Sequence, residues 1–222
     1  MNYIPQLYEF FGRLAANNNR AWFAEHKAEY EHFRALWLAD LQRIINRLAE
    51  SDPRLKNLQA KDCVYRIYRD TRFSHDKTPL KTFFSAAIGP GGRHHQGAGY
   101  YVHFGIDETG VYGGIWCPEG PDLRKLRKAI VDNIEEFREI IDNPEMQRLY
   151  PGWTGPKLKT APKGYPKDHP EIELLRLTEY GKWHPVGMDF FKHEDWPERM
   201  ADLLNVLRPL NDFINYSLTE EV

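Results

Sequence analysis

The stretch from residue 100 to residue 117 constrains the fold most, because two alternating apolar runs flank a short turn. Such runs over residues 100–106 and 111–117 are typical of a β-hairpin. We expect Ile106 to face Val111, since this register gathers the aliphatic side chains on one face. The other face would carry Tyr101, His103, Tyr112 and Trp116 around Gly105 and Gly114.

Helical periodicity dominates the rest of the chain. A helix from Pro5 to about Asn17, an asparagine cap and a longer second helix predict an opening α-hairpin. A long helix should start at Pro121 and stop at Pro144, and a last helix starting near Asp195 should kink at Pro209. Further strands are expected at residues 63–68 and 83–88, and a helix-strand unit at 171–186.

These elements predict the fold class and the domain organisation. Strands joined by hairpins with helices before and after them indicate an α+β fold. We expect an antiparallel-rich sheet with an N-terminal α-hairpin and later helices packed on it. No repeat or linker divides the sequence, so residues 1–222 are predicted to form a single domain.

Composition excludes several classes of protein. The formal net charge of -2 gives no overall attraction to nucleic acid or membrane. Cys63 and Cys117 are too few for a disulfide framework and lack metal-ligand spacing. With no signal peptide and no apolar run long enough for a membrane helix, we expect a cytoplasmic protein without a cofactor.

The most informative segment is YRIYRDTRFSHDKTPLKT at residues 65–82, a strand and the turn that leaves it. Residues 62–81 hold five cationic and three acidic side chains, a local net charge of +2. An arginine pointing from a half-buried strand needs a partner, because an unpaired buried charge costs about 3–5 kcal/mol. Asp70 and Asp76 are the nearest candidates.

This segment resembles the hallmark of a conserved bacterial and fungal family filed as a domain of unknown function. The matching residues are Arg66, Tyr68, Arg69, Asp70, Arg72, Phe73, Ser74, Asp76, Lys77, Pro79 and Lys81. The resemblance extends through Asn18, Asn19, Trp22 and Phe23, the Tyr-Tyr-Val-His run, and the loop after Leu158; it departs at Leu80, where many relatives carry an aromatic residue. The resemblance implies an α+β fold and no assigned activity.

Two interpretations of the segment remain open. As a site, its side chains would cradle a phosphate or carboxylate, because arginine supplies forked donors and lysine supplies point charges. As scaffold, they would form a salt-bridge network that pins the strand to neighbouring helices. The predicted ligand contacts are Arg69, Arg72, Ser74, Lys77 and Lys81.

Enzymatic activity is the alternative to a binding module. Asp70 or His103 would then act as general base on a phosphate-bearing substrate, and the ring face around His103 would stack a base or a sugar. The histidine and carboxylate spacings match no metal site, so we expect none. The expected partner is a small anionic ligand, nucleic acid remains an alternative, no membrane is expected, and the oligomeric state is left open.

Overall fold

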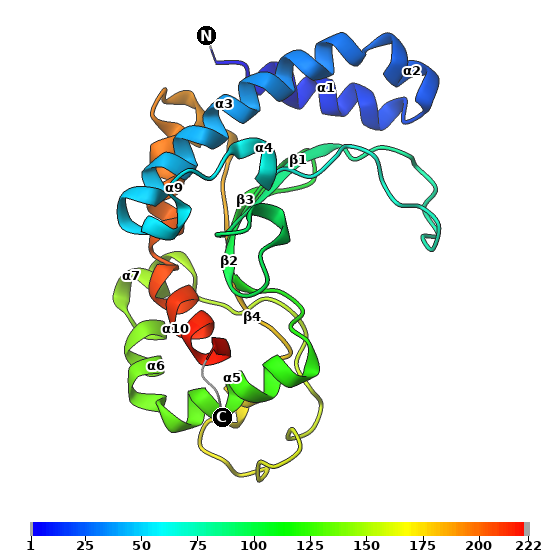
Figure 1. Cartoon of the computed structure of the whole chain (residues 1–222). Coiled ribbons are helices and arrows are strands. Elements are labelled where there is room, and N and C mark those ends of the chain that lie inside the picture. Colours follow the sequence, from blue (N-terminus) through cyan, green and yellow to red (C-terminus); the bar gives the residue numbers. More distant parts are fainter. Residues whose placement is uncertain (1, 220–222) are drawn as a thin grey trace. The chain divides into compact units, whose positions relative to one another are not determined.

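The computed structural model describes residues 2–219 and confirms the predicted α+β class. Within this range the chain forms ten α-helices and a four-stranded antiparallel sheet with the order β1-β2-β3-β4 (Figure 1). The strands are β1 Phe83–Ile88, β2 Gly99–Gly105, β3 Thr109–Ile115 and β4 Tyr180–Pro185.

The predicted hairpin is present, but its predicted register was wrong. The Gly105 amide donates to the Glu108 carbonyl at 3.0 Å, and the Thr109 hydroxyl donates to the Gly105 carbonyl at 3.2 Å. Gly105 therefore faces Glu108 and Thr109, whereas pairing Ile106 with Val111 would have put it opposite Tyr112. The turn falls earlier than expected because the Thr109 side chain caps the end of β2.

The opening helices agree with the prediction, apart from one break. Helix α1 spans Ile4–Ala16, and the Asn19 side chain caps α2 (Arg20–Glu25) by accepting from the Trp22 amide. Helix α3 then spans Lys27–Ser51. The expected second helix is divided at His26, whose ring stacks on Trp22 at 3.8 Å and bonds to the Trp22 carbonyl.

The chain divides into two compact units. Unit 1 comprises residues 1–95, 101–111 and 185–202, and unit 2 comprises residues 96–100, 112–184 and 203–222. Strands β2, β3 and β4 and helix α9 (Trp196–Asn205) have residues in both. The prediction of a single domain stays a prediction.

The core of unit 1 is aromatic and joins the N-terminal helices to the sheet. Phe84 of β1 meets Phe11 of α1 edge-on at 5.1 Å and stacks on Trp37 of α3 at 5.8 Å. Phe104 of β2 packs against Phe191 of the short 3₁₀ helix η3 (Met188–Lys192) at 5.4 Å. Smaller elements are η1 (Pro53–Leu55), α4 (Ala60–Cys63) and η2 (Gly92–His94).

Unit 2 holds most of the later helices. The helix predicted from Pro121 is divided at Asn133 into α5 (Gly120–Asp132) and α6 (Ile134–Ile141). Pro144 starts α7 (Pro144–Leu149) rather than only ending its predecessor, because proline suits the first turn of a helix. Helix α8 is Ile172–Leu175, and α10 is Arg208–Thr219.

The final helical segment is broken rather than kinked. Helix α9 ends at Asn205, and Pro209 lies in the first turn of α10. Leu207, between the two helices, packs against Gly113 of β3 so closely that a Cβ there would lie 2.7 Å from it. In the described part of the chain, no helix is both long and apolar enough to cross a membrane.

Candidate functional site

The signature segment forms a two-stranded arm, defined here as residues 64–82, which leads into β1 (Figure 1). An isolated bridge from Tyr68 to Leu80 joins its strands, and a second bridge from Val64 to Ala86 joins the start of the arm to β1. The amides of Arg69 and Lys81 donate to Pro79 and Ile67 at 2.9 and 2.8 Å. The predicted continuous strand at residues 63–68 was therefore wrong, because Cys63 ends α4 and the pairing beyond it is intermittent.

The outer half of the arm holds two local ion pairs. Arg69 donates to the Asp76 carboxylate and to the Thr78 hydroxyl across the arm. Asp70 accepts from Arg72 at 2.7 Å on the same strand. Hydrogen bonds from Arg72 to Asp70, and from Thr78 and Arg69 to Asp76, lower the pKa of each carboxyl to about 2.

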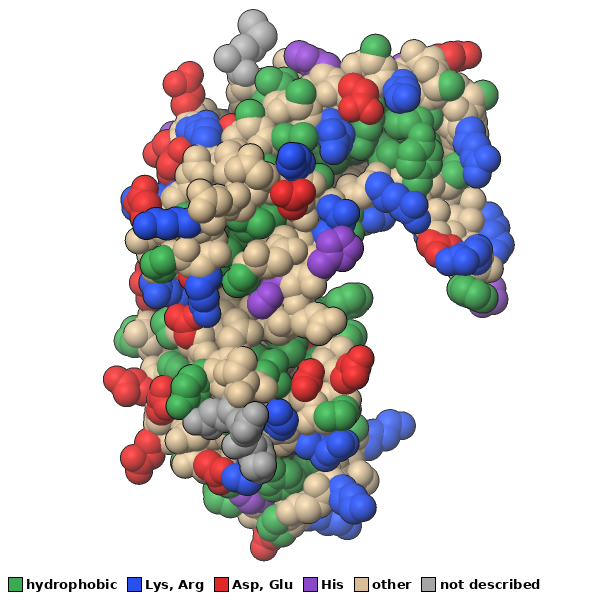
Figure 2. Space-filling view, in the orientation of Figure 1, with side chains coloured by type: hydrophobic (Ala, Val, Ile, Leu, Met, Phe, Trp, Pro, Cys, Tyr) green, Lys and Arg blue, Asp and Glu red, His purple; other side chains and the backbone are tan. Residues whose placement is uncertain are grey.

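The remaining predicted contacts near the tip serve the turn itself. Lys77 Nζ donates to the Thr71 carbonyl at 2.9 Å, and the Ser74 amide donates to the same carbonyl at 3.4 Å. Phe73 is 94% exposed beside the Arg72 guanidinium. Arg72, Ser74 and Lys77 thus lie together at the tip, where the side chains of Arg72 and Lys77 and the backbone amide of Ser74 make local contacts. Basic side chains recur along the arm (Figure 2).

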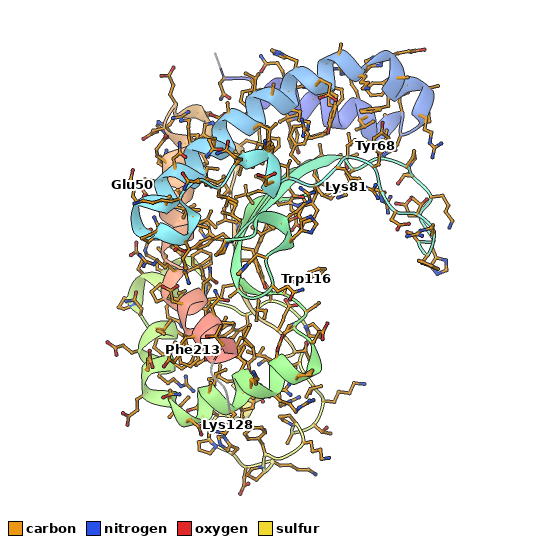
Figure 3. The ribbon with its side chains drawn as sticks, viewed as in Figure 1. Glu50, Tyr68, Lys81, Trp116, Lys128 and Phe213 are labelled. Carbon is orange, nitrogen blue, oxygen red and sulfur yellow. The ribbon has the colours of Figure 1, made fainter. Side chains whose placement is uncertain are left out.

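Lys81 lies at the base of the arm, and Tyr68 lies farther out along it (Figure 3). Lys81 Nζ is 5.2 Å from the centre of the Tyr65 ring and 5.6 Å from that of Phe83. Burial lowers the pKa of Lys81, and the positive charges of Arg66 and Arg69 lower it further. Neither Lys81 nor Arg66 forms an ion pair with any residue between 2 and 219.

His103 of β2 extends this group of rings. Its imidazole lies 4.4 Å from the Phe83 ring, and the Tyr101 hydroxyl bonds to Nδ1 at 3.1 Å. Burial lowers the pKa of His103, and the charge of Lys81 contributes in the same direction, while Glu108 and Asp107 oppose it. We call Tyr65, Lys81, Phe83, Tyr101 and His103 the Lys81 cluster.

Gly105 makes the close approach of these rings possible. A Cβ at this position would lie 2.8 Å from the Phe83 Cβ and 3.1 Å from His103 Nε2. The absence of a side chain therefore lets both rings lie over the end of β2. All members of the cluster belong to unit 1.

The ring face predicted from the hairpin differs from the one observed. Tyr101 and His103 do come together, but Tyr112 packs over Gly181, and Trp116 lies beyond the end of β3. Gly114 does not clear space for rings. It has φ +128°, and a Cβ there would lie 2.1 Å from the Tyr180 carbonyl oxygen. Its role is the close contact between β3 and β4.

Sequence reasoning missed Tyr65, Phe83 and Arg66. Alternation along the first arm strand puts residues 65, 67 and 69 on one face, but it does not link Tyr65 to Lys81. The missing information was the pairing of the two arm strands, since Lys81 approaches Tyr65 only after the chain folds back. Of the two weak catalytic candidates, Asp70 lies in the outer arm and His103 lies in the cluster.

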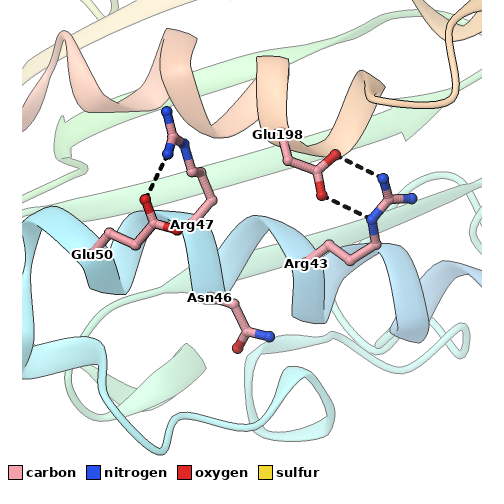
Figure 4. A pocket seen from close by; sticks show the side chains of 5 residues that line it. All are labelled: Arg43, Asn46, Arg47, Glu50 and Glu198. Atoms are coloured by element: carbon pink, nitrogen blue, oxygen red, sulfur yellow. Dashed lines mark hydrogen bonds and ion pairs between the residues drawn. The ribbon is translucent and has the colours of Figure 1, made fainter.

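A separate pocket in unit 1 is lined by Arg43, Asn46, Arg47 and Glu50 of α3 and Glu198 of α9 (Figure 4). Arg43 forms a forked pair with Glu198, at 2.9 and 2.7 Å. Arg47 pairs with Glu50 and with Asp202. Because these charges pair with one another, the pocket is poorly suited to bind an anion.

Ligands for a metal ion do not come together in the described chain. No group of three or more His, Cys, Asp or Glu side chains with suitable placement occurs between residues 2 and 219. The functional groups of the Lys81 cluster are one ammonium group, one imidazole and the aromatic rings of Tyr65, Phe83 and Tyr101.

The fold and the cluster together define an α+β protein with a cationic, aromatic surface at the edge of its sheet. Residues 6–213 match the model of the conserved hypothetical protein family DUF2461, and the chain belongs to that family. No curated protein is significantly similar to the chain. No solved structure is significantly similar to it either.

Proposed function

We propose that this protein is a binding module for a phosphorylated or carboxylated ligand, held at the base of the arm by Lys81 and Arg66. The observation that carries the proposal is the state of Lys81. It is a half-buried ammonium group with two guanidinium groups acting on it and no carboxylate partner among residues 2–219. A bound anion would offset the desolvation and the repulsion at once.

The outer arm contributes less than the sequence alone suggested. Arg69 and Arg72 already bind Asp76 and Asp70, and Lys77 binds a backbone carbonyl. These contacts use part of the donor capacity of the three side chains, and the two carboxylates offset the charges of Arg69 and Arg72. Arg69 acts on Lys81 through its charge, while Arg72, Ser74 and Lys77 shape the tip.

Catalysis on a phosphate-bearing substrate is the second candidate function, and the position of His103 favours it. Burial lowers the pKa of His103 and so favours the neutral imidazole, which is the form that a general base needs. Asp70 fits this role poorly, because a carboxyl with a pKa of about 2 is a weak base.

Calorimetric titration with pyrophosphate and citrate at low and high salt tests the proposal. Binding should weaken as salt rises, because the attraction is electrostatic. Lys81→Met should abolish most of the binding, whereas Lys77→Met, which removes an equal charge from the tip, should leave most of it. Equal losses of affinity in the two variants would place the site elsewhere on the arm. If the unaltered protein binds neither anion at low salt, the proposal of a binding module is refuted.

A further inference from the structure

The aromatic rings of the Lys81 cluster narrow the class of ligand further than its positive charge does. Phe83, Tyr101 and His103 lie close together on the sheet, with ring centres 4.4 Å apart for Phe83 and His103 and 6.0 Å apart for Tyr101 and His103. Tyr65, on the arm, shares the Lys81 ammonium group with Phe83 and is 40% exposed. A site for inorganic phosphate needs hydrogen-bond donors and has no use for aromatic rings. The rings of the cluster therefore suit a ligand that also has a flat apolar part.

We infer that the ligand is a nucleotide, with its base stacked on Tyr65 and its phosphate paired with Lys81. This inference rests on the proposed function and narrows its ligand class. Aromatic side chains interleaved with cations on an exposed strand surface are the usual means of binding unpaired nucleotides, because every base has a π-face.

The position of the ammonium group fits this arrangement. Lys81 Nζ lies over both the Tyr65 and the Phe83 rings, 5.2 and 5.6 Å from their centres. A group stacked on Tyr65 therefore keeps its attached phosphate within reach of Lys81. Arg66, which is exposed and lowers the pKa of Lys81 through its charge, adds to the positive potential around that phosphate.

A sugar phosphate fits the cluster less well. Binding a sugar depends on hydrogen bonds to several hydroxyl groups, for which carboxylate and amide side chains are suited. The Lys81 cluster has no such side chain, and the Tyr101 hydroxyl already bonds to His103. Stacking of a base requires only an exposed ring, which Tyr65 provides.

Titration with four probes tests the inference: pyrophosphate, ribose 5-phosphate, adenosine 5′-monophosphate and a short single-stranded oligothymidylate. The nucleotide should bind about tenfold more tightly than ribose 5-phosphate, in line with the measured contribution of base stacking. Tyr65→Leu should remove this preference and leave pyrophosphate binding in place. Tyr65→Phe, which keeps the ring, should retain the preference.

Tyr68→Leu is the matched control. Tyr68 is on the same arm and is 48% exposed, but its ring packs edge-on against Phe23 and is not part of the cluster. The substitution should leave the nucleotide preference unchanged. Thermal melting of each variant checks that it folds.

The outcomes separate the inference from the proposed function. If ribose 5-phosphate binds as tightly as the nucleotide, or if Tyr65→Leu keeps the preference, the nucleotide assignment is overturned while anion binding stands. If no probe binds, both are overturned. Tighter binding of the oligothymidylate than of the mononucleotide supports a nucleic-acid strand as the source of the nucleotide, and equal binding supports a free nucleotide.

Discussion

Arg69 and Asp76 pair across the two strands of the arm, and the Thr78 hydroxyl completes the contact. The Arg69 side chain is 28% exposed and that of Asp76 is 57% exposed. The sequence left two alternatives for Arg69, a structural salt bridge from a half-buried strand and a contact with a ligand. The observed pair matches neither fully, because it is partly exposed and Arg69 is already paired. It is a partly exposed cross-strand ion pair that holds the two strands of the arm together.

Arg69→Met should therefore change the global stability little, because exposed ion pairs contribute little to it. It should loosen the arm instead. Hydrogen exchange should become faster at the Arg69 and Lys81 amides, which bond to Pro79 and Ile67 across the arm. Arg72→Met, which breaks the pair with Asp70 on one strand, should leave those two amides protected. A large loss of stability in Arg69→Met would contradict this role.

Gly105→Ala should destabilise the protein by about 1–3 kcal/mol, the usual cost of forcing extra atoms into a packed site. The new methyl group would overlap the Phe83 Cβ and press on His103 Nε2. Gly12→Ala is the control, because a Cβ there meets nothing within 4 Å in helix α1. That change should stabilise the protein by about 0.5–1 kcal/mol. Chemical denaturation measures both, and equal effects would show that Gly105 has free space.

The pKa of His103 should depend on the positive charge of Lys81. The midpoint of its titration, followed by NMR, should lie below 6.5, because burial and the nearby ammonium group both disfavour the imidazolium. Lys81→Met should move the midpoint up. Pyrophosphate should also move it up in the unaltered protein, since a bound anion favours the charged ring. An unchanged midpoint in Lys81→Met would mean that the two groups do not interact.

Lys182 should make stability depend on pH in the alkaline range. Its side chain is 1% exposed, its Nζ donates to the Tyr150 carbonyl at 2.9 Å, and burial lowers its pKa to about 8. Below pH 8 the folded and unfolded chains both carry the proton. Between about pH 8 and 10.5 the folded chain releases it first, so this residue favours folding more as pH rises.

The difference in unfolding free energy between the unaltered protein and Lys182→Met isolates this effect, because other groups titrate in both. The unfolding free energy of the unaltered protein should increase relative to that of Lys182→Met as the pH rises from 8 to 10.5. A difference that stays constant over this range would show that Lys182 has an ordinary pKa.

The sequence alone determined the local elements. Periodicity located β1 at residues 83–88, as observed, and the asparagine run predicted a cap by one of its members, which proved to be Asn19. These features depend on neighbours within a few residues, so the sequence carries them directly. The family resemblance likewise agreed with the match over residues 6–213.

The tertiary structure alone decided the hairpin register, the pairing of Arg69 with Asp76, and the cluster around Lys81. Each depends on which residues meet after the chain turns back. The turn at Ile106 and Asp107, shifted from its expected place by the Thr109 hydroxyl, changed every cross-strand neighbour. Tyr65 and Lys81 are 16 positions apart in the sequence, and only the pairing of the arm strands brings the ammonium group to the ring. Local propensity sets the strand and helix types, whereas long-range pairing sets the chemistry of the site.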